Sequence, residues 1–161
     1  MSVNKYLPHV LVLPEDDANS SVANGFHLEI VSTKSKQMQV LPVAGGWNEV
    51  LRRIGSEHSS EMVRCPERFM VLLIDFDNQA DRLRKAKAAI PPEITDRVLV
   101  LGVLSAPEDL KNTLGSYETI GSALARDCRD GTDATWGHNL LLHNASELDR
   151  LRQHVRPFLF Q

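Results

Sequence analysis

The sequence predicts an α/β protein: a three-layer fold in which helices cover both faces of a mostly parallel sheet of four or five strands. Short apolar runs, such as 71–74 and 98–101, recur along the chain and are typical of strands buried on both faces. Segments with helical spacing separate these runs, and this alternation indicates βαβ units. The chain has 161 residues and no linker or repeat, which predicts a single domain over 1–161.

Three strands are expected in the first half of the chain, at 10–13, 38–43 and 69–75. A helix at 18–30 follows the first strand, with Asp16 or Asp17 as its N-cap. After the second strand, the pair Gly45-Gly46 makes a tight turn into a helix at 47–54. The polar stretch 55–67 is predicted to be a loop.

The second half is expected to hold a fourth strand at 98–101 and a fifth at 139–143. Ser105 is the expected N-cap of a helix that begins near Pro107. Further helices are expected at 80–90, 117–127 and 147–155, with a polar loop at 129–138.

Composition favours a globular protein without a membrane span. No apolar stretch approaches the roughly 18–20 residues that a span needs, and no signal peptide is expected. Cys65 and Cys128 lack metal or redox spacing and indicate reduced thiols, so we expect a cytoplasmic protein. The net charge of -3 gives no overall attraction to nucleic acid, so such binding would need a local basic patch or a partner.

Acidic, hydroxyl or glycine residues follow each of the first four strands at the point where the strand ends. They are Glu15, Gly45-Gly46, Asp75 with Asp77, and Ser105. Because the carboxyl ends of parallel strands meet at one edge, we expect these residues to lie along it. Clustered acids require compensation, and a divalent cation is the simplest candidate. The alternative is that they cap a helix or pair with an arginine.

This pattern resembles the Toprim family, which is shared by topoisomerases, bacterial primases, OLD-type nucleases and RecR-like repair proteins and has a flavodoxin-like arrangement. Glu15, Gly45-Gly46 and Asp75-Phe76-Asp77 carry the resemblance, which covers roughly residues 9–105. It implies that Glu15, Asp75 and Asp77 hold Mg²⁺ or Mn²⁺ for phosphoryl transfer or phosphodiester cleavage on nucleic acid. Glu15 is either a ligand or the general base.

The resemblance is incomplete. Asp16 stands where the family usually has glycine, and Asn19 stands where a second acid often follows. Asp16 and Asp17 are therefore additional candidate ligands or only caps. The chain would be a stand-alone unit that works with a separate ATPase, as OLD-type systems suggest. Tyr117 is expected in the core, and His138 and His143 are weaker candidates for proton donors.

Basic residues follow the acidic strand end and offer the best patch for nucleic acid, unless they are only a solvated helix face. They are Arg82, Arg84, Lys85 and Lys87.

Two other functions compete. The chain also resembles receiver domains of response regulators, which would be phosphorylated at Asp75. Receivers need a lysine after strand five, where this chain has His143-Asn144, and Asp77 has no role in them, so the Toprim interpretation is preferred. A non-catalytic interaction subunit is the third possibility, and the acidic net charge favours it.

Overall fold

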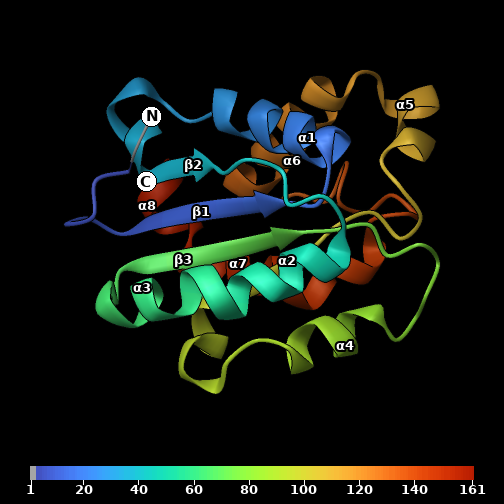
Figure 1. The fold of residues 1–161 in the computed structure, drawn as a ribbon. Coiled ribbons are helices and arrows are strands. Elements are labelled where there is room, and N and C mark those ends of the chain that lie inside the picture. Colours follow the sequence, from blue (N-terminus) through green and yellow to red (C-terminus); the bar gives the residue numbers. More distant parts are fainter. Residues whose placement is uncertain (1–2) are drawn as a thin grey trace.

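The computed structural model of the protein describes residues 3–161 as a three-layer α/β fold (Figure 1). The sheet has four strands, all parallel, in the order β2-β1-β3-β4. They are β1 (His9–Pro14), β2 (Met38–Val40), β3 (Arg68–Leu73) and β4 (Val98–Leu101). This order is flavodoxin-like, and the predicted fold class is confirmed. No helix in this part of the chain is long and apolar enough to cross a bilayer.

Helices cover both faces of the sheet. One face packs against α1 (Asp17–Leu28), α6 (Tyr117–Asp130), α7 (Ala145–His154) and α8 (Arg156–Phe160). The other packs against α2 (Trp47–Arg53), α3 (Ser59–Arg64) and α4 (Arg82–Ala88). Strand side chains alternate between the two cores: Val10 and Val12 belong to the first, Leu11 and Leu13 to the second. Burial on both faces explains why the strands are continuous apolar runs.

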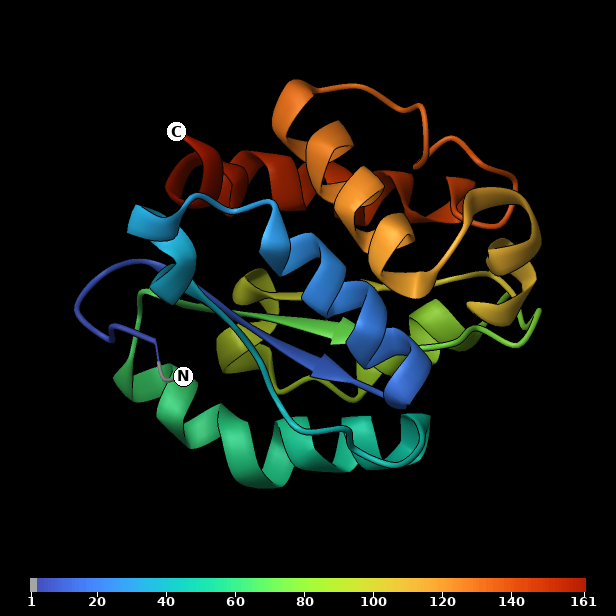
Figure 2. The ribbon, with the colours of Figure 1, turned by 90° about the horizontal axis from the view of Figure 1, so that it is seen from above.

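Shorter elements connect these layers. The 3₁₀ segments η1 (Ser32–Gln37) and η3 (Pro92–Arg97) lead into β2 and β4. Helix α5 (Glu108–Leu114) lies at the end of the molecule toward which the strands point (Figures 1 and 2).

The predicted loop at 55–67 is wrong. The helix that starts at Trp47 instead continues through a π-helical segment, η2 (Ile54–His58), into α3. Ile54 and Met62 are fully buried in the second core, and they hold this polar stretch against the sheet. Within 55–67 only Met62 is a buried apolar residue, and this gave too weak a periodicity to indicate a helix.

The predicted fifth strand at 139–143 is also wrong, because this stretch forms turns that lead into η4 (Leu142–Asn144). Side chains take its place beside β4. Asn144 accepts a hydrogen bond from the Gly102 N–H at 3.1 Å and donates one to the Gly102 carbonyl at 2.9 Å. Arg150 of α7 donates to the Val98 carbonyl at 3.2 Å. These groups satisfy outward-facing backbone atoms that a fifth strand would have paired.

Smaller differences concern the ends of elements. β2 ends at Val40 rather than at 43, and α6 continues to Asp130. Gly131, with φ of 71°, ends α6 in the left-handed conformation that favours glycine. Pro157 lies in the first turn of α8 instead of ending the preceding helix.

Helices α1 and α6 cross at two glycines (Figure 2). A Cβ atom on Gly25 would lie 2.1 Å from the carbonyl oxygen of Glu118, and one on Gly121 would lie 1.9 Å from that of Val22. The two backbones therefore approach more closely than any side chain permits. This contact fixes α1, whose first turn carries part of the site, against α6.

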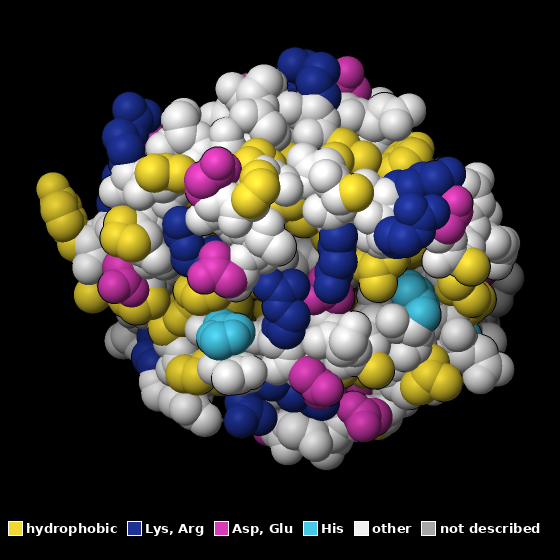
Figure 3. All heavy atoms as spheres, turned by 90° about the horizontal axis from the view of Figure 1, so that it is seen from below, with side chains coloured by type: hydrophobic (Ala, Val, Ile, Leu, Met, Phe, Trp, Pro, Cys, Tyr) yellow, Lys and Arg dark blue, Asp and Glu magenta, His cyan; other side chains and the backbone are white. Residues whose placement is uncertain are grey.

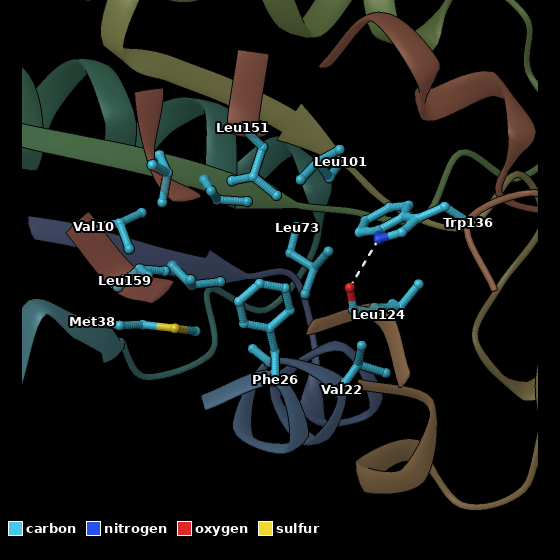
Figure 4. Close-up of a pocket in the computed structure, with 14 residues that line it drawn as sticks. Val10, Val22, Phe26, Met38, Leu73, Leu101, Leu124, Trp136, Leu151 and Leu159 are labelled. Atoms are coloured by element: carbon cyan, nitrogen blue, oxygen red, sulfur yellow. Dashed lines mark hydrogen bonds between the residues drawn. The ribbon is translucent and has the colours of Figure 1, made fainter. Parts of the chain in front are cut away.

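The first core contains a cavity of about 60 Å³ (Figure 4). Every lining side chain is apolar except for the indole N–H of Trp136, which donates to the Leu124 carbonyl at 3.0 Å. A water molecule in the cavity would find no free polar partner, so we expect the cavity to be dry. Its lining includes Phe26, Leu73, Leu151 and Leu159.

Candidate functional site

The candidate site lies where the strand order reverses. β1 and β3 are neighbours in the sheet although β2 comes between them in the chain. Ligands of open α/β sheets bind at the carboxyl ends of strands at such a switch point. The register pairs Pro14 with Leu73, so Glu15 and Asp75 leave the sheet from adjacent strands.

Glu15 and Asp75 are in direct contact. Oε2 of Glu15 accepts a hydrogen bond from the backbone N–H of Asp75 at 2.6 Å. The Gly45 and Gly46 N–H groups donate to the backbone carbonyl of Glu15 at 2.9 and 3.2 Å. Both glycines have positive φ, 94° and 132°, which explains why glycine is needed in this turn. The structure thus brings together the residues predicted to follow the first three strands.

Asn19 of α1 joins two of the acids. Its side-chain amide, 1% exposed, donates to Oδ1 of Asp16 at 3.0 Å and to Oδ1 of Asp75 at 2.8 Å. Oδ1 of Asp16 also accepts from the Asn19 backbone N–H, which confirms Asp16 as the N-cap of α1. Asp17 is exposed on the first turn of that helix.

Burial raises the pKa of Asp75 to about 7, and the negative charges of Asp16, Glu15 and Glu108 add to this effect against the hydrogen bond from Asn19. Burial also raises the pKa of Glu15, reinforced by Asp16 and Asp77 and opposed by the Asp75 N–H and Arg82. Each carboxylate is thus made more basic by desolvation and by its neighbours. A bound cation would relieve this excess of negative charge.

Asp77 is held differently. Its backbone is left-handed, with φ of 49°, and Oδ2 lies 2.9 Å from Nη1 of Arg82. The same Nη1 donates to the Asp75 carbonyl at 2.8 Å, and the guanidinium lies 4.3 Å from the centre of the Trp47 ring. Arg82 is only 4% exposed, so its assignment to an exposed nucleic-acid patch is wrong. It is a buried support of the site.

The other three basic residues of α4 have acidic neighbours. Arg84 and Lys85 are exposed and lie 3.8 and 3.0 Å from Asp81, while Lys87 lies 3.0 Å from the buried carboxylate of Glu147. Figure 3 shows the face that carries α4, where acidic and basic side chains are interspersed. A role for Arg84, Lys85 and Lys87 in contacting nucleic acid stays a prediction.

The acids at this edge offer the oxygen ligands that Mg²⁺ prefers. Within residues 3–161, no three or more His, Cys, Asp or Glu side chains are grouped so as to hold a metal ion. Glu15 and Asp75 nevertheless fit Mg²⁺, which keeps several waters and needs only one or two carboxylates. In this part of the chain, one oxygen of each carboxylate makes no hydrogen bond. Oδ2 of the expected third ligand, Asp77, is paired with Arg82, and its part in metal binding stays a prediction.

Tyr117, Glu108 and Lys111 were missed as site residues. Tyr117 is the first residue of α6, half-buried and packed against the first core, so the expectation that it lies in the core is met in part. Partial burial and the carboxylates of Glu108, Asp16 and Asp75 raise the pKa of its phenol. Glu108 and Lys111 lie on α5, and neither was predicted from the sequence to have a role in the site.

Ser105 lies beside the site but does not cap α5, because the cap position is occupied by Pro107. Its carbonyl accepts a hydrogen bond from the Asp77 N–H at 3.2 Å, and its buried hydroxyl has no partner in the described part of the chain. His143 packs edge-on against Phe76 with ring centres 4.7 Å apart, and burial lowers its pKa.

This arrangement places two carboxylates, which are oxygen ligands of the kind that Mg²⁺ prefers, at adjacent strand ends, and desolvation makes both of them more basic. Arg82 can keep the loop after β3 in place. Comparison with known family models, curated proteins and solved structures finds no match to this chain.

Proposed function

We propose that the protein is a Toprim-like, Mg²⁺- or Mn²⁺-dependent enzyme that transfers phosphoryl groups or cleaves phosphodiester bonds in nucleic acid. The observation that carries this proposal is the contact between Glu15 and Asp75 at the switch point of the sheet. Bound there, Mg²⁺ would polarise a phosphoryl oxygen and offset the charge that develops in the reaction.

Each residue then has a chemical task. Asp75 is the better ligand of the pair, because its carboxylate is held by the neutral amide of Asn19, and Arg82 reaches only its backbone carbonyl. Glu15 is the candidate general base, since a raised pKa brings a carboxyl closer to the pH at which it would accept a proton from attacking water. Asp77 and Arg82 position the loop that carries Asp75.

The protein acts with a partner in this proposal. A net charge of -3 and an α4 face of mixed charge give little general attraction to nucleic acid. A separate subunit, such as an ATPase, would supply further binding surface.

Incubation of the purified protein with labelled DNA or RNA and Mn²⁺ tests this proposal. Wild type should cleave slowly, Glu15→Gln should lose cleavage, and Asp75→Asn should lose both cleavage and Mn²⁺ binding measured by calorimetry. Asp17→Asn is the matched control, because it removes an exposed acid from the same segment and should change neither property.

Two results would favour the alternatives. Uptake of phosphate from acetyl phosphate at Asp75, without any cleavage, would support the receiver-like function. Neither reaction, together with no stabilisation by Mg²⁺ or Mn²⁺, would leave the interaction subunit as the better description.

A further inference from the structure

Lys111 is held over an aromatic ring beside the acidic site. Its Nζ, on α5, lies 4.5 Å from the centre of the Tyr117 ring at the start of α6. An ammonium in this position is attracted by the electron-rich face of the ring. The contact limits where the ammonium of a long and otherwise flexible side chain can lie.

This pair stands next to the acids that the proposed function uses. The phenol of Tyr117 senses the charges of Asp16 and Asp75, which come from the ends of β1 and β3. Figure 1 places α5 at the same end of the molecule as the tips of these strands. Lys111 therefore brings a positive charge to this end of the molecule.

Lys111 also differs from three basic residues of α4. Arg82 is buried against Asp77, Lys85 lies 3.0 Å from Asp81, and Lys87 lies 3.0 Å from Glu147. Lys111 is exposed and makes no ion pair within residues 3–161. An ammonium that is positioned, solvated and not neutralised by a carboxylate can accept an anionic ligand without breaking a contact to an acid.

We propose that Lys111 binds a phosphate group of the nucleic-acid strand whose neighbouring phosphodiester lies at Glu15 and Asp75, and that Tyr117 is its positioning residue. The identity of the ligand as nucleic acid rests on the proposed function. The location of the contact rests on the geometry of Lys111 and Tyr117. The proposed phosphate-binding cation thus belongs to α5.

Binding of a fluorescein-labelled single-stranded oligonucleotide, followed by anisotropy with Ca²⁺ at several salt concentrations, tests this inference. Lys111→Ala should weaken binding several-fold and reduce the slope of log affinity against log salt by about 0.7, the loss of one phosphate contact to a single strand. Lys111→Arg should restore the slope. Lys36→Ala, an exposed lysine of η1 (Ser32–Gln37) at the amino end of β2, is the matched control and should leave the slope unchanged.

The role of Tyr117 has its own variants. Tyr117→Phe keeps the ring and should bind as wild type does, whereas Tyr117→Leu keeps an apolar side chain, loses the ring and should weaken binding. Equal effects of the Phe and Leu substitutions would overturn the positioning role.

An unchanged salt slope in Lys111→Ala, or no detectable binding by wild type, would overturn the phosphate contact. Binding that depends on Lys111 without any cleavage would refute the proposed enzyme and keep the contact. Normal cleavage and affinity in Lys111→Ala would refute the contact alone.

Discussion

Arg82 gives Asp77 a positive partner that Asp75 does not have. Its Nη1 lies 2.9 Å from Oδ2 of Asp77 but reaches Asp75 only at the backbone carbonyl, 2.8 Å away. The side chain of Asp75 instead accepts from the neutral amide of Asn19. The sequence presents the two acids as equivalent, but the carboxylate of Asp77 is paired with a cation, whereas that of Asp75 has a neutral partner and lies near other carboxylates.

Neutralising these two acids should have opposite effects on the free energy of unfolding. Asp75→Asn should stabilise the metal-free protein, because it removes a buried charge near other carboxylates. Asp77→Asn should destabilise it, by about 0.5–1 kcal/mol, because it removes the partner of Arg82 from a pair that is half exposed on the Asp77 side. Urea denaturation in EDTA measures both changes, and a gain of stability in Asp77→Asn would contradict the assigned pairing.

The stability of the metal-free protein should depend on the pH through Asp75. Its pKa is raised from 3.8 to about 7 on folding, so between these values the folded state holds a proton that the unfolded state has lost. This contribution is complete below pH about 4 and is lost as the pH rises through about 7.

Asp75→Asn isolates this effect. Its advantage in unfolding free energy over wild type should be small near pH 4 and should grow up to neutral pH. Mg²⁺ affinity of wild type should rise over the same range, because the ion competes with the proton. A difference between the two proteins that does not change with pH would show that Asp75 is not the titrating group.

The crossing of α1 and α6 should tolerate no side chain at its two glycines. Gly25→Ala and Gly121→Ala place a Cβ against backbone carbonyls that cannot move aside, and each should cost about 3 kcal/mol or more. Gly55→Ala, also in a helical segment but with open space around its Cβ, should gain about 0.5–1 kcal/mol. Thermal melts of the three variants measure the contrast, and similar values would refute the close approach.

The first core already contains a cavity, so removing further side-chain atoms beside it should lower the free energy of unfolding. Leu151→Ala would enlarge the void beside Leu101 and Trp136 and should cost about 2–5 kcal/mol. Leu142→Ala removes the same atoms from a side chain that is 59% exposed and should change stability by less than about 0.5 kcal/mol. Denaturant midpoints compare the two.

The sequence was most informative about the sheet. Residues on both faces of β1, β3 and β4 are buried, so apolar runs such as 98–101 marked these strands directly, whereas the edge strand β2 is only partly buried and contains Gln39. The sequence predicted that Glu15 and Asp75 lie at the same edge of the sheet. They are in contact because β1 and β3, which they follow, are neighbouring strands. The fifth strand failed because Leu140, Leu141 and Leu142 are as apolar as a strand, yet Asn144 already satisfies the edge of β4.

The fine geometry of the site could not be predicted from sequence. Whether Asp77 faces a metal or Arg82 depends on a left-handed turn that a non-glycine residue seldom adopts. Lys111 and Tyr117 are separated from the acids in sequence and from each other by a loop, so only the packing of α5 and α6 brings them together.

The carboxamide of Asn144 presents one donor and one acceptor side by side, as a peptide group does. At Gly102 it imitates one residue of a strand, but it offers no further backbone onto which another chain could add. Growth of the sheet by self-assembly through this part of β4 would first have to expel a buried amide from two hydrogen bonds. A single side chain thus prevents another polypeptide from adding a strand at this position, at the end of β4.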